Sequence, residues 1–83
     1  MNMKNMHSIL IADDEKHVRN DIIQSMHWSD YGFYIIGEAE NGRQALQMIQ
    51  DLQPDVLITD IKMPFANGLK LIESAHQIKP DIQ

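Results

Sequence analysis

Three short apolar segments, each followed by a stretch with helical periodicity, constrain the fold of this chain more than any other feature. The first segment, residues 9–12, reads Ile-Leu-Ile-Ala without interruption, which is typical of a strand buried on both faces. The other strand candidates are residues 34–39, weakened by Gly37, and residues 56–59. Because strands alternate with helices, the sequence predicts right-handed crossovers and a parallel sheet of the α/β class.

Apolar residues that recur every three to four positions predict three helices between and after these strands. The first is expected at residues 16–26, and the second follows Asn41, which we interpret as part of its N-terminal cap. The third begins near Leu69 and ends at Lys79, before a proline, and Lys70 and Lys79 are expected to be solvated. The residues predicted to face inward are Val18, Ile22, Met26, Ala45, Leu46, Ile49, Leu52, Leu71, Ile72, Ala75 and Ile78.

Composition restricts the classes of function that the chain can have. It has 83 residues, a formal net charge of −5 and no cysteine. Without a basic stripe, this chain is a poor candidate for binding nucleic acid by itself. The lack of cysteine excludes thiolate metal sites and fits the cytoplasm, which is the predicted location. No apolar run approaches the roughly 18 residues of a membrane helix, so we expect no membrane partner.

Carboxylates follow two strands that are neighbours if the first strand lies in the middle of the sheet. Asp13 and Asp14 come directly after the first strand, and Asp60 comes after the third. The carboxyl ends of parallel strands are where such sheets bind ligands. Clustered carboxylates repel one another, and their hard oxygen atoms suit Mg²⁺. The sequence therefore predicts a Mg²⁺ site, to which a backbone carbonyl near Lys62 is a possible further ligand.

A carboxylate beside Mg²⁺ can also act as a nucleophile and form an aspartyl-phosphate. Asp60 suits this role because it is the single carboxylate at its strand end, whereas Asp13 and Asp14 suit metal binding. Taken alone, an acidic pair more often begins a solvated helix, and a lone Asp often forms a turn. Their combination at neighbouring strand ends favours the metal site.

The segments ILIADDE, VLITDIKMP and NGLKLIE together resemble the receiver domain of two-component response regulators, from Ser8 onward. The resemblance implies a flavodoxin-like (CheY-like) doubly wound parallel sheet, here with three strands in the order 2-1-3 and three helices. It implies that Asp60 accepts a phosphoryl group from a sensor histidine kinase. Mg²⁺ would then be held by Asp13, Asp14, Asp60 and the backbone carbonyl of Lys62.

By the same resemblance, residues 1–7 are a leader and residues 8–83 are the N-terminal part of a receiver domain. The family sheet has five strands, and this sequence ends at KPDIQ, where the fourth strand is expected to begin. The family's Ser or Thr after the fourth strand and Lys after the fifth are not in this sequence, so we expect deficient switching. We also expect residues 56–59 to form an open sheet edge and the chain to self-associate, for instance as a dimer.

The stretches HWSDYGF and YGFYIIGEAENGRQAL are similar to a subgroup of receivers fused to an AraC-type helix-turn-helix domain. This implies a transcriptional regulator that binds DNA only through a domain outside this sequence. We expect a phosphoacceptor signalling module and not an enzyme. Two alternatives remain, namely a receiver-like dimerisation module without chemistry and a Mg²⁺-dependent phosphohydrolase that forms an aspartyl-phosphate. Against the second, Lys62 stands where such enzymes tend to carry another Asp.

Overall fold

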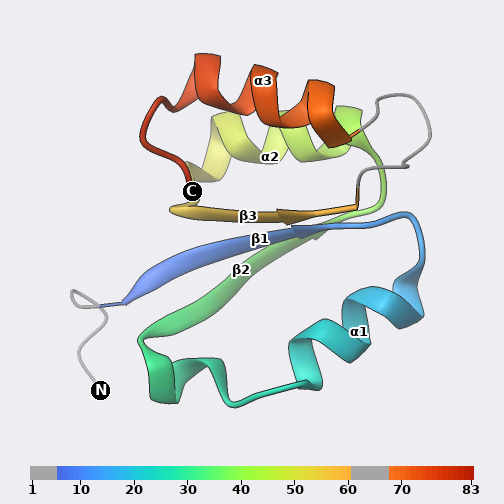
Figure 1. The fold of residues 1–83 in the computed structure, drawn as a ribbon, viewed down its shortest axis with the longest axis vertical. Helices are drawn as coiled ribbons and strands as arrows, with labels where there is room; N and C mark the ends of the chain where they lie inside the picture. Colours follow the sequence, from blue (N-terminus) through green and yellow to red (C-terminus); the bar gives the residue numbers. More distant parts are fainter. Residues whose placement is uncertain (1–5, 61–67) are drawn as a thin grey trace.

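A computed structural model describes residues 6–60 and 68–83 of the chain. Its elements are β1 (His7–Ala12), α1 (Lys16–Gln24), the 3₁₀ helix η2 (Trp28–Tyr31), β2 (Phe33–Ala39), α2 (Gly42–Leu52), β3 (Val56–Thr59) and α3 (Gly68–Ile78). The strands form a parallel sheet in the order β2-β1-β3. Helices α2 and α3 cover one face of the sheet and α1 covers the other (Figure 1). The predicted α/β fold, with its strand order 2-1-3 and three helices, is confirmed.

Local signals set most of the element boundaries. The side chain of Asn41 accepts a hydrogen bond from the backbone N–H of Gln44, which confirms the predicted cap of α2. Helix α1 ends two residues before its predicted end at Met26. There, the indole N–H of Trp28 donates to the carbonyls of Ile22 and Ile23, and so satisfies carbonyls that the end of a helix leaves without partners.

The hydrophobic core lies between the sheet and the two helices α2 and α3. Its buried residues are Leu10, Ala12, Ala39, Ala45, Ile49, Leu71, Ala75 and Ile82. Ile72 and Leu52, predicted to face inward, are instead 37% and 39% exposed. Leu71 and Ala75, four residues apart, occupy the inward face of α3, and the adjacent Ile72 is rotated about 100° away from it. Among the described residues, no helix has the length and apolar content to span a membrane.

The pairing of β1 with β2 changes register by one residue in the middle of the strands. Ile9 pairs with Ile35, but Leu10 pairs with Gly37, so that Ile36 has no partner in the register. Gly37 packs closely against α2, and a Cβ atom at this position would collide with the end of the Met48 side chain. The shift therefore places a glycine on the face of the sheet that α2 covers, where the Met48 side chain lies against it.

The prediction that residues 56–59 form an open sheet edge is wrong for the first part of β3, because the last residues of the sequence pair with it. The N–H of Leu57 donates to the carbonyl of Gln83, and the N–H of Gln83 donates to the carbonyl of Asp55. These bonds have the pattern of a parallel ladder. Ile82 is 4% exposed and joins the core. The first half of β3 is thus already paired, and self-association of the chain stays a prediction.

Candidate functional site

Three acidic residues meet at the carboxyl end of the sheet. Asp13 and Asp60 each come directly after a strand, and hydrogen bonds between neighbouring strands fix both. The N–H of Asp60 donates to the carbonyl of Ala12, and the N–H of Asp13 donates to the carbonyl of Ala39, each at 3.0 Å. Single carboxylate oxygens of Asp13, Asp14 and Asp60 lie within 4.8 Å of one another. The structure therefore brings together the three carboxylates that the sequence singled out.

The arrangement of these oxygens fits a small divalent cation. Asp13 is 8% exposed, Asp60 is half-buried and Asp14 is exposed, so the group opens from the protein interior to solvent. Oxygen ligands of an octahedral Mg²⁺ lie about 2.9 Å apart when adjacent and about 4.2 Å apart when opposite. Small side-chain movements would bring the three oxygens to these distances. Lys62, whose carbonyl is predicted as a further ligand, lies outside the described residues.

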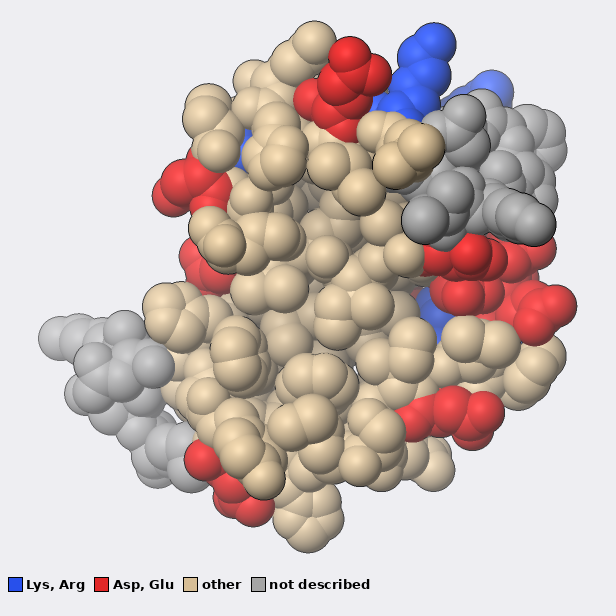
Figure 2. All heavy atoms as spheres, in the orientation of Figure 1, with Lys and Arg blue, Asp and Glu red and all other residues tan. Residues whose placement is uncertain are grey.

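Acidic side chains dominate the surface around this site. Figure 2 shows Asp and Glu atoms gathered at the right of the view, at the end of the sheet where β1 and β3 finish (Figure 1), with a basic side chain among them. The Asp13 carboxylate is held by one of its oxygens, Oδ1, which accepts a hydrogen bond of 2.9 Å from the N–H of Glu15. A carboxylate has two oxygens, so this bond orients Asp13 and leaves acceptor capacity for a ligand.

Arg19 on α1 also contacts the loop that carries the acidic pair. Its Nη1 donates to the backbone carbonyl of Asp13 at 2.7 Å, and its Nε donates to Oε1 of Glu38 at 3.0 Å. The Arg19 side chain is only 11% exposed. Neither Arg19 nor Glu38 was predicted from the sequence as part of the site. The available signal was weak: an arginine at the end of the first turn of the helix that follows the acidic pair.

A single carboxylate, that of Asp55, is held in a hydrogen-bonded cluster at the opposite end of the sheet. Asp55 accepts hydrogen bonds from the N–H and hydroxyl of Ser8, and from Nζ of Lys79. Lys79 also donates to the carbonyls of Gln53 and Pro54, and its side chain is 14% exposed. The prediction that Lys79 is solvated is therefore wrong. The backbone N–H of Ser8 above all lowers the pKa of Asp55 below its ordinary value of 3.8. Burial opposes this shift, and Lys79 lowers the pKa further.

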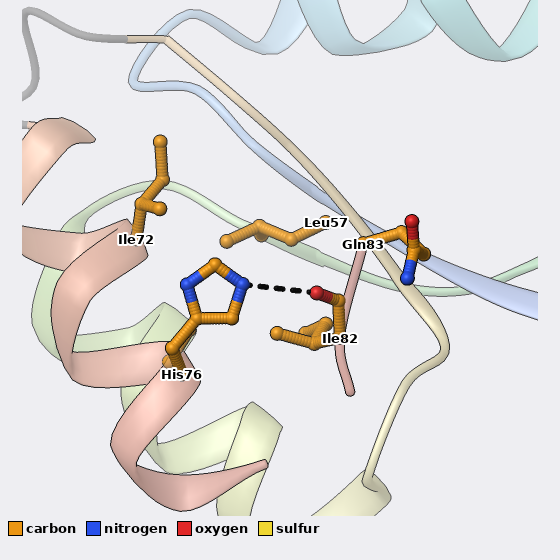
Figure 3. A pocket seen from close by; sticks show the side chains of 6 residues that line it. Leu57, Ile72, His76, Ile82 and Gln83 are labelled. Atoms are coloured by element: carbon orange, nitrogen blue, oxygen red, sulfur yellow. Dashed lines mark hydrogen bonds between the residues drawn. The ribbon is translucent and has the colours of Figure 1, made fainter. Parts of the chain in front are cut away.

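An apolar hollow lies between α3 and the outer edge of β3 (Figure 3). Nε2 of His76 donates to the carbonyl of Ile82 across it, at 3.0 Å. Its volume is about 110 Å³, well below the roughly 300–1,000 Å³ of ordinary small-molecule sites. The hollow is lined by Leu57, Ile72, Ala75, His76, Ile82 and Gln83. Because it is small and mostly apolar, the acidic cluster is the stronger candidate for a functional site.

Comparisons with known proteins show which family this sequence and fold resemble. The family model described as "Response regulator receiver domain" matches residues 9–83. The chain is 38% identical over 78 residues to the transcriptional regulatory protein YesN of Bacillus subtilis, covering 94% of this chain and 21% of YesN.

Two solved structures have the same fold and related sequences. One is the REC domain of AraT, a response regulator from Geobacillus stearothermophilus, with a TM-score of 0.89 and 35% identity over 94% of this chain and 60% of that one. Another is the two-component transcriptional regulator AraC from Clostridium phytofermentans, with a TM-score of 0.87 and 35% identity over 93% of this chain and 62% of that one.

The chain spans about a fifth of the length of YesN and about three fifths of the two solved chains. The match nevertheless covers nearly all of the present sequence and both of the strand ends that carry the acidic cluster. The similarity to receivers of AraC-type regulators, predicted from the sequence, is confirmed by these relatives. The chain belongs to the response regulator receiver domain family of two-component systems.

Proposed function

We propose that this chain is the phosphoacceptor module of a response regulator, in which Asp60 receives a phosphoryl group from a histidine of a sensor kinase. The observation that supports it is the meeting of one oxygen each from Asp13, Asp14 and Asp60 within 4.8 Å, at neighbouring strand ends. In this proposal Asp13, Asp14 and Asp60, with the carbonyl of Lys62, hold Mg²⁺. The cytoplasm is the proposed compartment, in keeping with a sequence that lacks cysteine.

Burial and backbone support favour Asp60 as the nucleophile. Asp60 is half-buried at the end of β3, whereas Asp14 is exposed to solvent. The backbone N–H of Asp60 donates a hydrogen bond to the carbonyl of Ala12 in the central strand, so the Asp60 side chain is attached to a rigidly held backbone. Such support favours phosphoryl transfer, which depends on alignment more than on acid–base chemistry.

The transfer itself needs one bond to form and one to break. A carboxylate oxygen of Asp60 attacks the phosphorus atom, and the bond from phosphorus to the imidazole nitrogen of the kinase breaks. The electron pair of that bond returns to the nitrogen, which takes a proton from solvent. When bound, Mg²⁺ supplies positive charge to the phosphoryl oxygens and so reduces their repulsion with Asp60.

Mass spectrometry after incubation with Mg²⁺ and a small phosphodonor such as acetyl phosphate tests this proposal. We expect a gain of one phosphoryl group that hydroxylamine removes, as it does for an acyl phosphate. Asp60→Asn should abolish the labelling. Asp55→Asn, which changes a carboxylate at the other end of the sheet, should leave it intact. Equal labelling of the Asp60→Asn variant and the unaltered chain would show that Asp60 is not the acceptor.

We further propose that the parent protein regulates transcription. YesN and the Clostridium protein carry that description in their names, and each extends beyond the region matched here. DNA contact would lie in that additional region, because the present chain is acidic, with a net charge of −5. Gel-shift assays with the full-length protein and with this chain alone should show DNA binding by the full-length protein only.

A further inference from the structure

We propose that Arg19 is a positioning residue for the acidic site, with Glu38 holding its guanidinium in place. This inference rests on the proposed binding of Mg²⁺ by Asp13 and Asp14. Two hydrogen bonds carry it, one to the carbonyl of Asp13 and one to the carboxylate of Glu38. In this proposal Arg19 does not itself touch the metal or the phosphoryl group.

The bond to the Asp13 carbonyl orients more than one residue. The peptide group that joins Asp13 to Asp14 is planar, so fixing its carbonyl oxygen also fixes the direction of the Asp14 N–H and Cα. On the other side, the N–H of Asp13 donates to Ala39 in β2, and its Oδ1 accepts from Glu15. Arg19 thus completes a set of three bonds that together determine where the acidic pair points.

The guanidinium is suited to this task in a way that an ammonium is not. Nε and Nη1 donate at the same time in two directions, to Glu38 on β2 and to the carbonyl after β1. A lysine ends in a single nitrogen and cannot reproduce that planar fork. The pairing with Glu38 also offsets the positive charge of Arg19 locally. The effect of Arg19 on the acidic pair would then come from orientation as well as from charge.

A merely structural role is the alternative, because Arg19 also links α1 to β2. The chain contains a matched control for it at the other end of the sheet. Lys79 is similarly buried, with 14% of its side chain exposed against 11% for Arg19. It too joins a carboxylate, that of Asp55, to backbone carbonyls. Removing either cation should destabilise the fold, but only the loss of Arg19 should disturb the acidic site.

The experiment measures Mg²⁺ affinity by titration calorimetry and the unfolding temperature of each variant in parallel. Arg19→Gln and Arg19→Lys should weaken Mg²⁺ binding about tenfold, as is usual when a residue supporting metal ligands is lost. Glu38→Gln should cause a smaller loss. Lys79→Met should lower the unfolding temperature and leave Mg²⁺ affinity unchanged. Equal Mg²⁺ affinity in the Arg19→Lys variant and the unaltered chain would overturn the proposal.

Hydrogen exchange of the Glu15 amide, followed by NMR without metal, provides a second readout. That N–H donates to Oδ1 of Asp13, so a misplaced acidic pair should expose it to solvent. We expect faster exchange in Arg19→Lys and no change in Lys79→Met; an equal effect in both variants would mean that Arg19 only stabilises the fold. Failure of the unaltered chain to bind Mg²⁺ would overturn the metal assignment and this inference together. Normal Mg²⁺ binding with no effect at Arg19 would overturn the inference alone.

Discussion

The two ends of the β-sheet both carry acidic side chains, but the surroundings of their negative charges differ. At the amino end, Asp55 accepts hydrogen bonds from Ser8 and Lys79, and its pKa is lowered as a result. At the carboxyl end, one carboxylate oxygen each of Asp13, Asp14 and Asp60 lies within 4.8 Å of the others. The first arrangement satisfies a carboxylate within the fold, whereas the second accumulates like charges that a cation would stabilise. The proposed functional site and the paired Asp55 carboxylate therefore lie at opposite ends of the strands.

The largest expected difference between the two ends is in how substitutions there change the stabilisation of the fold by Mg²⁺. At a concentration one hundred times its Kd, an ion that binds only the folded state stabilises it by about 2.7 kcal/mol. We expect chemical denaturation to show this gain in the unaltered chain and in Asp55→Asn. Asp13→Asn should lose most of it, because Asp13 is the most buried of the three carboxylates. A full gain in Asp13→Asn would place the ion elsewhere.

Removing the carboxylate at the amino end should have the next largest effect. Asp55→Ala leaves the N–H of Ser8 and the Nζ of Lys79 without this partner, and we expect a loss of about 1–2 kcal/mol in the free energy of unfolding. Asp55 is 42% exposed, so solvent limits the cost. Asp51→Ala on the surface of α2 is the control and should change stability little. If Asp55→Ala and Asp51→Ala lowered the free energy of unfolding equally, the contacts of Asp55 with Ser8 and Lys79 would not stabilise the fold.

Acid should weaken the amino end selectively. The pKa of Asp55 is lower in the folded than in the unfolded chain, so its ionised form stabilises the fold at pH above about 4. That stabilisation is lost as the pH falls through the folded-state pKa. Between about pH 6 and pH 2.5, the free energy of unfolding should therefore fall less with decreasing pH in Asp55→Ala than in the unaltered chain. Chemical denaturation at several pH values measures this dependence. Parallel pH profiles would contradict the lowered pKa.

Charge removal at the carboxyl end should have the smallest effect and the opposite sign. Without Mg²⁺, Asp14→Asn relieves repulsion among the three carboxylates and should raise the free energy of unfolding by about 0.5 kcal/mol. With Mg²⁺ present, the same variant should lose its advantage. Asp21→Asn on α1 is the matched exposed control. A loss of stability in Asp14→Asn without metal would mean that the acidic cluster is not strained by its own charge.

The sheet and the acidic cluster could be predicted from the sequence because local patterns determine them. A continuous apolar run marks the central strand, and a carboxylate directly after a parallel strand has to lie at the carboxyl edge. Asn41 was recognisable as a cap because that role depends on residues three positions apart. The metal and phosphoacceptor roles of Asp13, Asp14, Asp60 and Lys62 stay predictions.

The contacts that sequence reasoning missed join residues far apart in the chain. Lys79 and Asp55 are 24 residues apart, and Asp55 and Ser8 are 47 apart. Arg19 and Glu38 are 19 apart, on a helix and a strand whose relative placement no periodicity specifies. The exposure of Ile72 was missed because a helix with several apolar residues has more than one candidate for its inward face.

The one-residue register shift between β1 and β2 determines which face of the sheet Glu38 lies on. Beyond the shift, Glu38 pairs with Ile11, whose neighbours Leu10 and Ala12 face the core beneath α2 and α3. Glu38 therefore points to the α1 side, where Arg19 lies. If the ladder instead continued from Ile35 through Ile36 without the shift, Glu38 would lie opposite Ala12, on the other face. In this sheet the register of the strand, and not only the identity of its residues, decides whether Glu38 can accept a hydrogen bond from Arg19 near the acidic site.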